Sequence, residues 1–364
     1  MSDDGIEKLR RRIDAIDEQL LDLFNQRARC AVEVATVKRE SSDKPDEAID
    51  FFRPDREAQV IKRLKSLNQG PLSDQEVGRL IREVMSACLA LEQPLKIAYL
   101  GPEGTFTQSA ALKHFGHSVS TVPMSSIPDV FASVESGHAS YGLVPVENST
   151  EGVISHTLDM FIDSSLRVCG EVEIPIHHHL ASKLQDVARI KYLYSHQQSF
   201  AQCRRWLDQN LPGVERIPVS SNAEAARLAA IEEDAAAICG LPAVEIFALK
   251  ICYENIEDMP DNTTRFVIIG KQDVGPSGND KTSLLISTKN APGALLGLLQ
   301  PLADHGISMN KIESRPAKGH KWAYVFFIDI DGHQDDANVI DALNELKRQA
   351  ALFKILGSYP KALL

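Results

Sequence analysis

The sequence lacks the segments that direct a protein to export or to a membrane. Residues 1–12 are charged and contain no apolar stretch and no small-residue cleavage site. No later run reaches the roughly 18 uncharged apolar residues that a membrane span needs. The 6 cysteines are scattered and form no C-x-x-C pair, which predicts reduced thiols without disulfides or zinc. We therefore expect a cytoplasmic protein that has no membrane as a partner.

Positive charge is also scarce. The 364 residues include 50 Asp and Glu against 39 Lys and Arg, which gives a formal net charge of -11. Such a chain offers no broad electrostatic surface for nucleic acid, so an anionic ligand must be met by locally placed arginines and lysines. With 43% apolar residues the chain is too apolar to be disordered. Its length exceeds one ordinary core, and we expect two or three domains.

In residues 6–93 the apolar positions repeat at helical spacing. The first stripe has no breaker before residue 41 and consists of Ile13, Ile16, Leu20, Leu23 and Val34. It predicts a helix of about 30 residues, or roughly 45 Å, which two shorter helices cannot cover. We expect these helices at 53–68 and 74–91, the second with Ser73 as its N-cap. The long helix is therefore expected to pack against a second copy of the chain.

After Pro94 the pattern changes to short apolar runs between amphipathic helices, which indicates an α/β fold with parallel strands. Strands are expected at 96–100, 141–146, 190–194, 235–239 and 265–269. A segment of about 180 residues allows two lobes with a cleft. No G-x-G-x-x-G follows the first strand, where the turn is Gly101-Pro102-Glu103-Gly104.

Beyond the linker at 274–278 the elements follow the order βαββαβ, which is that of a ferredoxin-like α+β module. They are a strand at 282–288, a helix at 294–305, strands at 311–316 and 322–331, a helix at 337–349 and a strand at 351–359. We place the domains at 1–93, 94–273 and 280–364. The predicted chain is thus multidomain, with an all-α, an α/β two-lobed and an α+β part.

Three basic residues interrupt the apolar stripe of the long helix. At about 100° per residue, Arg27 and Lys38 fall within roughly 20° of the stripe, and Arg10 lies at its edge. A single such residue is best explained as a snorkelling or ion-paired side chain, but three together favour a dianionic ligand. On the third helix Cys88 and Glu92 lie one turn apart on the apolar face, which directs a carboxyl group inward.

Residues 6–93 resemble the all-helical chorismate mutases. The resemblance implies a substrate shell of Arg10 from the partner chain of an intertwined dimer with Arg27, Lys38, Arg56, Glu57, Cys88 and Glu92. Because chorismate rearranges to prephenate in one concerted step, the shell needs only to hold both carboxylates and to stabilise charge on the ether oxygen. We expect Lys38 and Glu92 at that oxygen. Glu92 must keep a proton to donate, and burial beside the substrate's charges favours its neutral form.

Four polar clusters lie beside predicted strands, at 101–106, 147–152, 195–198 and 262–266. Each alone is typical of a turn or a cap. Ligands of open α/β sheets bind where the strands end, next to helix N-termini. Uncharged donors that recur at comparable positions therefore predict a shared cleft.

These runs resemble prephenate dehydratase: Gly-Pro-x-Gly at 101–104, Val-Pro-Val-Glu-Asn-Ser at 144–149, Ser-His-x-Gln at 195–198 and Thr-Arg-Phe at 264–266. The resemblance implies two lobes like those of a periplasmic binding protein. It implies Thr264 as a central catalytic residue in a cleft lined by Glu147, Asn148, Ser149, Ser195, Gln198, Gln202, Arg265 and Phe266. Prephenate loses carbon dioxide and hydroxide, so we expect Thr264 to polarise the leaving hydroxyl, with a relay from Glu147 as one route. For Arg265 a structural salt bridge is an equal alternative.

The C-terminal module contains no cluster of nucleophile and base, and its runs at 293–296 and 313–316 resemble the ACT-type regulatory domain of this enzyme family. The resemblance implies a phenylalanine pocket across a dimer interface, formed by Gly293, Ala294, Leu295, Leu296, Glu313, Ser314, Arg315 and Pro316. A helix N-terminus suits the carboxylate of the amino acid, and apolar residues suit its ring. End-product inhibition by L-phenylalanine is the resulting hypothesis.

A metal site at His177, His178 and His179 is disfavoured because adjacent residues of an extended segment point to opposite faces. We expect neither a metal nor another cofactor. Two other functions remain to be compared with a mutase and dehydratase. A mutase fused to a prephenate dehydrogenase would need the dinucleotide motif that the first strand turn lacks. A non-catalytic amino-acid sensor would leave both candidate sites inactive in a rate assay.

Overall fold

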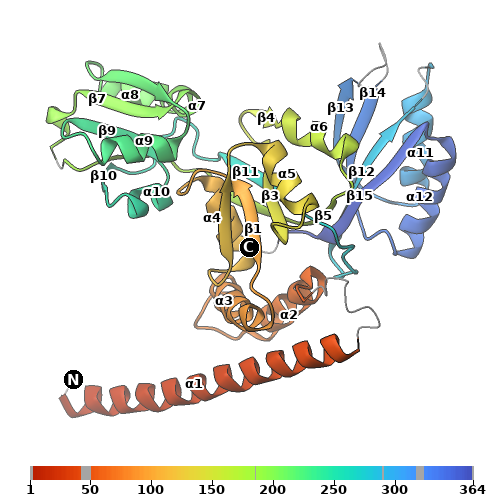
Figure 1. The fold of residues 1–364 in the computed structure, drawn as a ribbon, viewed down its shortest axis with the longest axis horizontal. Helices are drawn as coiled ribbons and strands as arrows, with labels where there is room; N and C mark the ends of the chain where they lie inside the picture. The colour runs from red at the N-terminus through yellow and green to blue at the C-terminus, as the bar shows by residue number, and fades with distance from the viewer. Residues whose placement is uncertain (1–2, 42–50, 185, 289–290, 317–323, 363–364) are drawn as a thin grey trace.

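The computed structural model describes residues 3–41, 51–184, 186–288, 291–316 and 324–362 (Figure 1). A helical region, an α/β region of two lobes and a small α+β module follow one another along the chain. Among the helices that these residues form, none is long and apolar enough to cross a bilayer.

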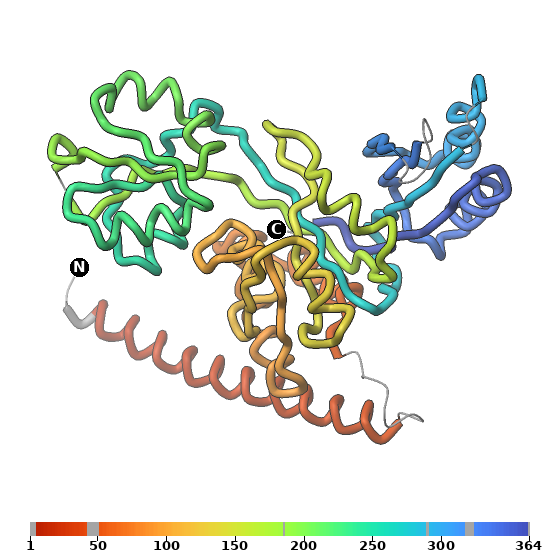
Figure 2. The backbone as a smooth tube through the Cα atoms, turned by 45° about the horizontal axis from the view of Figure 1, so that its top comes forward, coloured from red at the N-terminus to blue at the C-terminus, as the bar shows by residue number. Residues whose placement is uncertain are grey.

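The helical region consists of α1 (Asp3–Glu40), α2 (Pro54–Leu67) and α3 (Asp74–Glu92). Ser73 caps α3 as predicted, because its side chain accepts the Glu76 N–H at 3.2 Å. Helix α1 has 38 residues and extends along one side of the molecule (Figure 2). Its C-terminal half contacts α3, where Ala35 is buried. Apolar side chains of its stripe stay exposed, with Leu23 at 58% and Val34 at 50%.

The first α/β lobe is a six-stranded sheet in the order β2-β1-β3-β11-β5, with β4 paired to β3. Strands β1, β2 and β3 are parallel, whereas β11 is antiparallel to both of its neighbours. The elements are β1 (Lys96–Leu100), α4 (Phe106–Phe115), β2 (Ser120–Met124), α5 (Ile127–Glu135), β3 (Tyr141–Asn148), β4 (Gly152–Val153), α6 (Ser155–Asp163), β5 (Arg167–Pro175) and β11 (Thr263–Gly270).

The second lobe is a five-stranded sheet in the order β10-β6-β9-β7-β8. Its elements are β6 (His179–Ser182), η1 (Val187–Arg189), β7 (Tyr192–His196), α7 (Gln197–Gln202), α8 (Arg204–Asn210), β8 (Glu215–Val219), α9 (Asn222–Ala229), β9 (Ala235–Cys239), α10 (Leu241–Ile246) and β10 (Lys250–Tyr253). The expectation of parallel strands is wrong in part, because β6 and β10 add antiparallel pairs to the parallel strands β7, β8 and β9. The chain crosses between lobes after β5 and returns at β11, so both sheets are mixed.

The C-terminal module has the predicted βαββαβ order, with a fully antiparallel sheet β13-β14-β12-β15. Its elements are β12 (Asp280–Ser287), α11 (Ala294–Asp304), β13 (Met309–Pro316), β14 (Tyr324–Asp331), α12 (Ala337–Gln349) and β15 (Leu352–Pro360). Trp322, the predicted start of β14, lies outside the described residues. One face of the sheet packs against α11 and α12, and the other shares a core with the first lobe, as Leu285 and Phe327 do with Val267.

Candidate active sites

A cleft of about 680 Å³ lies between the two α/β lobes. All four polar clusters contribute to its walls, through residues that include Gly101, Gly104, Asn148, His196, Gln198, Asn262, Thr264 and Phe266. The N-terminus of α4 opens onto the cleft after Thr105, whose side chain accepts the Gln108 N–H and caps the helix. A helix N-terminus and several uncharged donors make this cleft suitable for an anionic ligand.

Thr264 and Asn148 face one another across β11 and β3, where they are register partners. The Asn148 amide donates to Thr264 Oγ1 at 2.8 Å and to Asn262 Oδ1 at 2.8 Å. Both Asn148 and Thr264 are 8% exposed. With its oxygen accepting from the amide, the Thr264 hydroxyl can donate its proton toward a ligand in the cleft.

A chain of hydrogen bonds links Thr264 to the second lobe. Asn262 donates to Gln202 Oε1 at 3.4 Å, and His178 Nε2 lies 2.8 Å from the same oxygen. Burial lowers the pKa of His178, so the imidazole is neutral and its Nε2–H donates to Gln202. Sequence reasoning included Asn262 in the polar cluster 262–266 but gave it no role of its own, and it missed His178 as a cleft residue. Asn262 could have been singled out beside Thr264, because it precedes Thr264 by two positions and period two keeps residues on one strand face.

Two of the predicted cleft residues support its walls from behind. Ser195 is fully buried and donates to Asn222 Oδ1 at 3.0 Å, and this oxygen also accepts the His196 N–H at 3.0 Å. Asn222 was not predicted, although it follows Ser221, the N-cap of α9, and lines the cleft. Ser149 Oγ donates to the Asp261 carbonyl at 3.3 Å and accepts the Thr263 N–H at 2.9 Å, so it closes the end of the β3–β11 pair.

Glu147 and Arg265 lie on the reverse face of the sheet. They are register partners, and neighbouring strand residues point to opposite faces, so they face away from Asn148 and Thr264. Arg265 pairs with Glu171 at 2.8 Å and with Asp329 of the C-terminal module at 2.6 Å. Of the two roles considered for Arg265, this geometry favours the structural salt bridge. Glu147 pairs with Lys311 at 2.7 Å, and its position across the sheet disfavours a relay to Thr264.

The helical region brings part of the predicted mutase shell together, with Arg27 and Lys38 of α1 close enough to Glu92 of α3 to act on its ionisation. Burial raises the pKa of Glu92, although Lys38, Arg27 and Arg39 each oppose this shift. Arg39 was not predicted; its guanidinium donates to the Glu92 carbonyl at 2.7 Å. Cys88 is buried one turn before Glu92.

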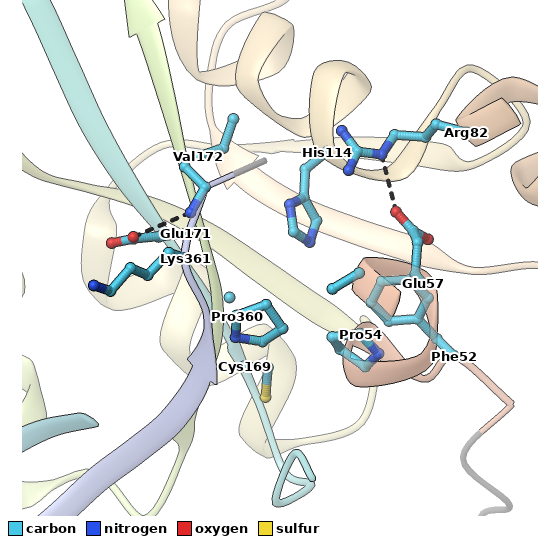
Figure 3. Close-up of a pocket in the computed structure, with 13 residues that line it drawn as sticks. Phe52, Pro54, Glu57, Arg82, His114, Cys169, Glu171, Val172, Pro360 and Lys361 are labelled. Carbon is cyan, nitrogen blue, oxygen red and sulfur yellow. Dashed lines mark hydrogen bonds and ion pairs between the residues drawn. The ribbon is translucent and has the colours of Figure 1, made fainter. Parts of the chain in front are cut away.

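Of the remaining shell residues, Glu57 lies close enough to Arg27 for that charge to oppose the rise in its pKa, whereas Arg10 and Arg56 lie elsewhere in this single chain. Arg10 is 17 positions before Arg27 on the same helix, a separation of about 25 Å. Arg56 is exposed on α2. Glu57 faces a junction of the helical region, the first lobe and residues 360–362, where it accepts from Arg82 Nε at 2.9 Å (Figure 3). Burial raises the pKa of Glu57 despite Arg82 and Arg27.

The two predicted regulatory runs lie at the same end of the C-terminal sheet. Gly293 has φ of 76° and precedes the first turn of α11, which contains Ala294, Leu295 and the 72% exposed Leu296. Strand β13 holds Glu313, Ser314, Arg315 and Pro316, and it ends beside the start of β14, which pairs with the end of β12. Arg315 also reaches the first lobe, where it pairs with Asp159 at 3.0 Å.

The three consecutive histidines have separate partners. His177 Nδ1 lies 2.8 Å from Glu257, His178 contacts Gln202, and His179 Nδ1 accepts the Asn255 N–H at 3.3 Å. In the part of the chain that the structure describes, no group of three or more His, Cys, Asp or Glu side chains is arranged to hold a metal ion.

Sequence profiles of three families match the chain: chorismate mutase type II over residues 9–93, prephenate dehydratase over 97–274 and the ACT domain over 282–348. The bifunctional chorismate mutase/prephenate dehydratase of Stutzerimonas stutzeri is 54% identical over 362 residues, which covers 99% of each chain. That of Pseudomonas aeruginosa is 53% identical over 365 residues, again 99% of each chain. A solved prephenate dehydratase from Arthrobacter aurescens in complex with L-Phe is 35% identical, with a TM-score of 0.68 over 74% of this chain and 90% of that one. These matches confirm the resemblances seen in the motifs, and the chain belongs to the bifunctional chorismate mutase/prephenate dehydratase family.

Proposed function

We propose that this chain converts chorismate to prephenate at the shell between α1 and α3, and prephenate to phenylpyruvate in the cleft. The boundaries 1–93, 94–273 and 280–364 separate the mutase, dehydratase and regulatory parts, and the enzyme works in the cytoplasm without a cofactor. The observation that carries the dehydratase assignment is the 2.8 Å hydrogen bond from Asn148 to Thr264 in the wall of the cleft.

In the dehydratase step the bond from the ring to its carboxylate breaks, and its electron pair moves into the ring as carbon dioxide leaves. The bond to the ring hydroxyl breaks at the far side, and the ring becomes aromatic. Hydroxide is a poor leaving group, so the site must donate a hydrogen bond or a proton to it. Thr264 does so as a polarised donor, because Asn148 fixes its oxygen. Gln198 and Phe266 supply a polar and an apolar wall beside it.

In the mutase step no group of the protein forms a covalent bond. Arg27 binds a substrate carboxylate, and Lys38 and the protonated Glu92 donate to the ether oxygen, where negative charge develops. The raised pKa of Glu92 supports this role, because only the neutral carboxyl group can donate. Cys88, Arg56 and Glu57 are proposed around the rest of the substrate.

A second copy of the chain completes the mutase site. The exposed stripe on α1, with Ile13 at 56% and Leu23 at 58%, is an apolar face that a partner helix would bury. Arg10 of that partner would then bind the second substrate carboxylate. The Arg10 of the same chain lies too far along α1 to do so. A homodimer is the smallest assembly that provides it.

L-Phenylalanine inhibits the dehydratase by binding at the C-terminal module. The pocket consists of the N-terminus of α11 with Gly293, Ala294, Leu295 and Leu296, and of Glu313, Ser314, Arg315 and Pro316 on β13. The L-Phe complex of the Arthrobacter aurescens enzyme supports this proposal. The exposed Leu296 would be covered by the ligand or by the second subunit.

The test is to give chorismate to the purified protein and to follow prephenate and phenylpyruvate separately, with and without phenylalanine. For Thr264→Ala we expect a dehydratase kcat lower by about 10²- to 10³-fold, as when other hydrogen-bond donors to a leaving oxygen are removed, with prephenate accumulating at the parent rate. Thr264→Ser, which keeps the hydroxyl, is the matched control and should retain most of the rate. If the alanine variant kept most dehydratase turnover, the role of Thr264 would be wrong.

A further inference from the structure

The C-terminal module binds one face of strands β3 and β11, and the opposite face of these strands carries the proposed dehydratase residues. Asn148 and Thr264 face the cleft from β3 and β11, while their chain neighbours Glu147 and Arg265 are bound on the reverse face. Lys311 of β13 binds Glu147, and Asp329 of β14 binds Arg265. Both contacts are therefore one residue away from the Asn148–Thr264 hydrogen bond.

The contact to Arg265 is shielded from water and fully oriented. The Arg265 and Asp329 side chains are 12% and 11% exposed, and their atoms Nη1 and Oδ2 are 2.6 Å apart. The other Asp329 oxygen accepts from Ser283 Oγ at 2.5 Å, and Tyr359 OH lies 3.0 Å from Arg265 Nη2. In this buried ion pair the other polar atoms of both side chains also form hydrogen bonds. A displacement of one side chain relative to the other would break several charged hydrogen bonds at once.

The contact to Glu147 lies at a second point on the same strand pair. Lys311 Nζ is 2.7 Å from Glu147 Oε2, with the two side chains 15% and 38% exposed. Beside these contacts the module also packs apolar side chains against the lobe, with Val325 and Leu356 in the same core as Val146. Each strand of the pair β3–β11 is therefore held by an ion pair to the module, and apolar packing adds to these contacts.

We propose that Asp329 and Lys311 are positioning residues for the dehydratase, supplied by the regulatory module: through Arg265 and Glu147 they fix β11 and β3 so that Asn148 orients Thr264. The same contacts then transmit inhibition, because a ligand that moves the module sheet must displace β11 or β3. This second part rests on the proposed regulation by phenylalanine, and the first part does not.

The experiment compares Asp329→Asn with Asp331→Asn in the full chain. Asp331 lies on the same strand, two residues on, and its partners Lys361 and Asn310 belong to the C-terminal module. For Asp329→Asn we expect dehydratase kcat to fall by about 10- to 100-fold, because a small displacement of a reacting group has effects of this size. KM for prephenate and the mutase rate should stay within twofold of the parent, and Asp331→Asn should match the parent in all three.

A dehydratase kcat of Asp329→Asn within twofold of that of Asp331→Asn would overturn the positioning role, and so would a rise in KM alone. Loss of the mutase activity in Asp329→Asn as well would indicate a general folding defect. In that case Lys311→Met provides the test of positioning, because the Lys311–Glu147 contact that it removes is more exposed. We expect that variant to lower kcat several-fold at unchanged KM, and an unchanged kcat would overturn the proposal.

The inhibitory part is read separately, from phenylalanine binding by calorimetry and from residual dehydratase activity at saturating phenylalanine. Asp329→Asn should bind phenylalanine but respond to it less than the parent does. An equal fractional inhibition in both proteins would overturn transmission through this contact. A parent that binds no phenylalanine would overturn the proposed regulation and leave the kcat test of positioning intact.

Discussion

Replacing Arg82 by methionine tests how much a buried ion pair between α2 and α3 contributes to stability where the helical region meets the first lobe. Arg82 lies on α3, and its Nε donates to Glu57 of α2 at 2.9 Å while its Nη1 donates to the Lys113 carbonyl of α4 at 3.1 Å. The Arg82 and Glu57 side chains are 7% and 13% exposed. Methionine retains much of the aliphatic volume of arginine, so the main change is the loss of charge opposite Glu57.

The expected loss of unfolding free energy is about 3–5 kcal/mol at neutral pH, the usual effect of removing one partner from a buried ion pair. The loss should depend on pH. Burial already raises the pKa of Glu57, and Arg82 opposes that shift, so the variant raises this pKa further. A carboxyl group whose pKa is higher in the folded than in the unfolded state lowers stability above the unfolded value, and the penalty shrinks as falling pH protonates it. The deficit of Arg82→Met should therefore be smaller at pH 5 than at pH 8.

The measurement is urea denaturation of the full chain at both pH values, followed by far-ultraviolet circular dichroism. Arg79→Met is the matched control, because it removes the exposed ion pair of Arg79 with Glu76 from the same helix and should leave the midpoint unchanged. Arg82→Met combined with Glu57→Met removes both charges and should recover most of the loss. A deficit equal to that of Arg79→Met, or one that is the same at pH 5 and pH 8, would refute the reasoning.

Three further changes test other parts of the structure. Mutase activity should fall as pH rises through the raised pKa of Glu92, and Glu92→Gln should flatten that profile; a profile that the substitution leaves unchanged would contradict a donor role. Gly293→Asp puts a side chain on a residue with φ of 76° and a carboxylate where that of phenylalanine is proposed, so inhibition should disappear at an unchanged dehydratase rate, whereas parental inhibition would exclude this pocket. At Gly357 an added Cβ would collide with the backbone of Val168 across the β15–β5 contact, so Gly357→Ala should lower the free energy of unfolding by about 1–3 kcal/mol in thermal or urea melts, and an unchanged midpoint would show that β15 can shift.

Local patterns were enough to predict the elements that depend on neighbours in the sequence. Ser73 indicated the start of α3, and the predicted helix 74–91 ends one residue before the observed Glu92. The order βαββαβ of the C-terminal module followed from alternating periodicities and turn residues. Capping and amphipathic spacing act over a few residues, so they are readable without knowledge of the fold.

The site residues that the sequence did not reveal depend on contacts between distant segments. Period two shows that Thr264 and Arg265 point to opposite faces of a strand, but it does not show which face borders the cleft. That is decided when β11 inserts between β3 and β5, more than 85 residues away in the chain. His178 and Asn222 line the cleft because the second lobe faces the first across it.

The predicted boundaries mark changes of sequence pattern, and the cores of the folded chain extend across them. Phe52 of the helical region shares a core with Tyr141 and Phe266 of the first lobe. Leu356 of the C-terminal module shares another core with Val168. Burial of apolar surface is the main contribution to stability, so segments that share a core also share stability. The first lobe therefore lies between two regions that stabilise it. A substitution in either region can displace the strands β3 and β11 without contacting the substrate.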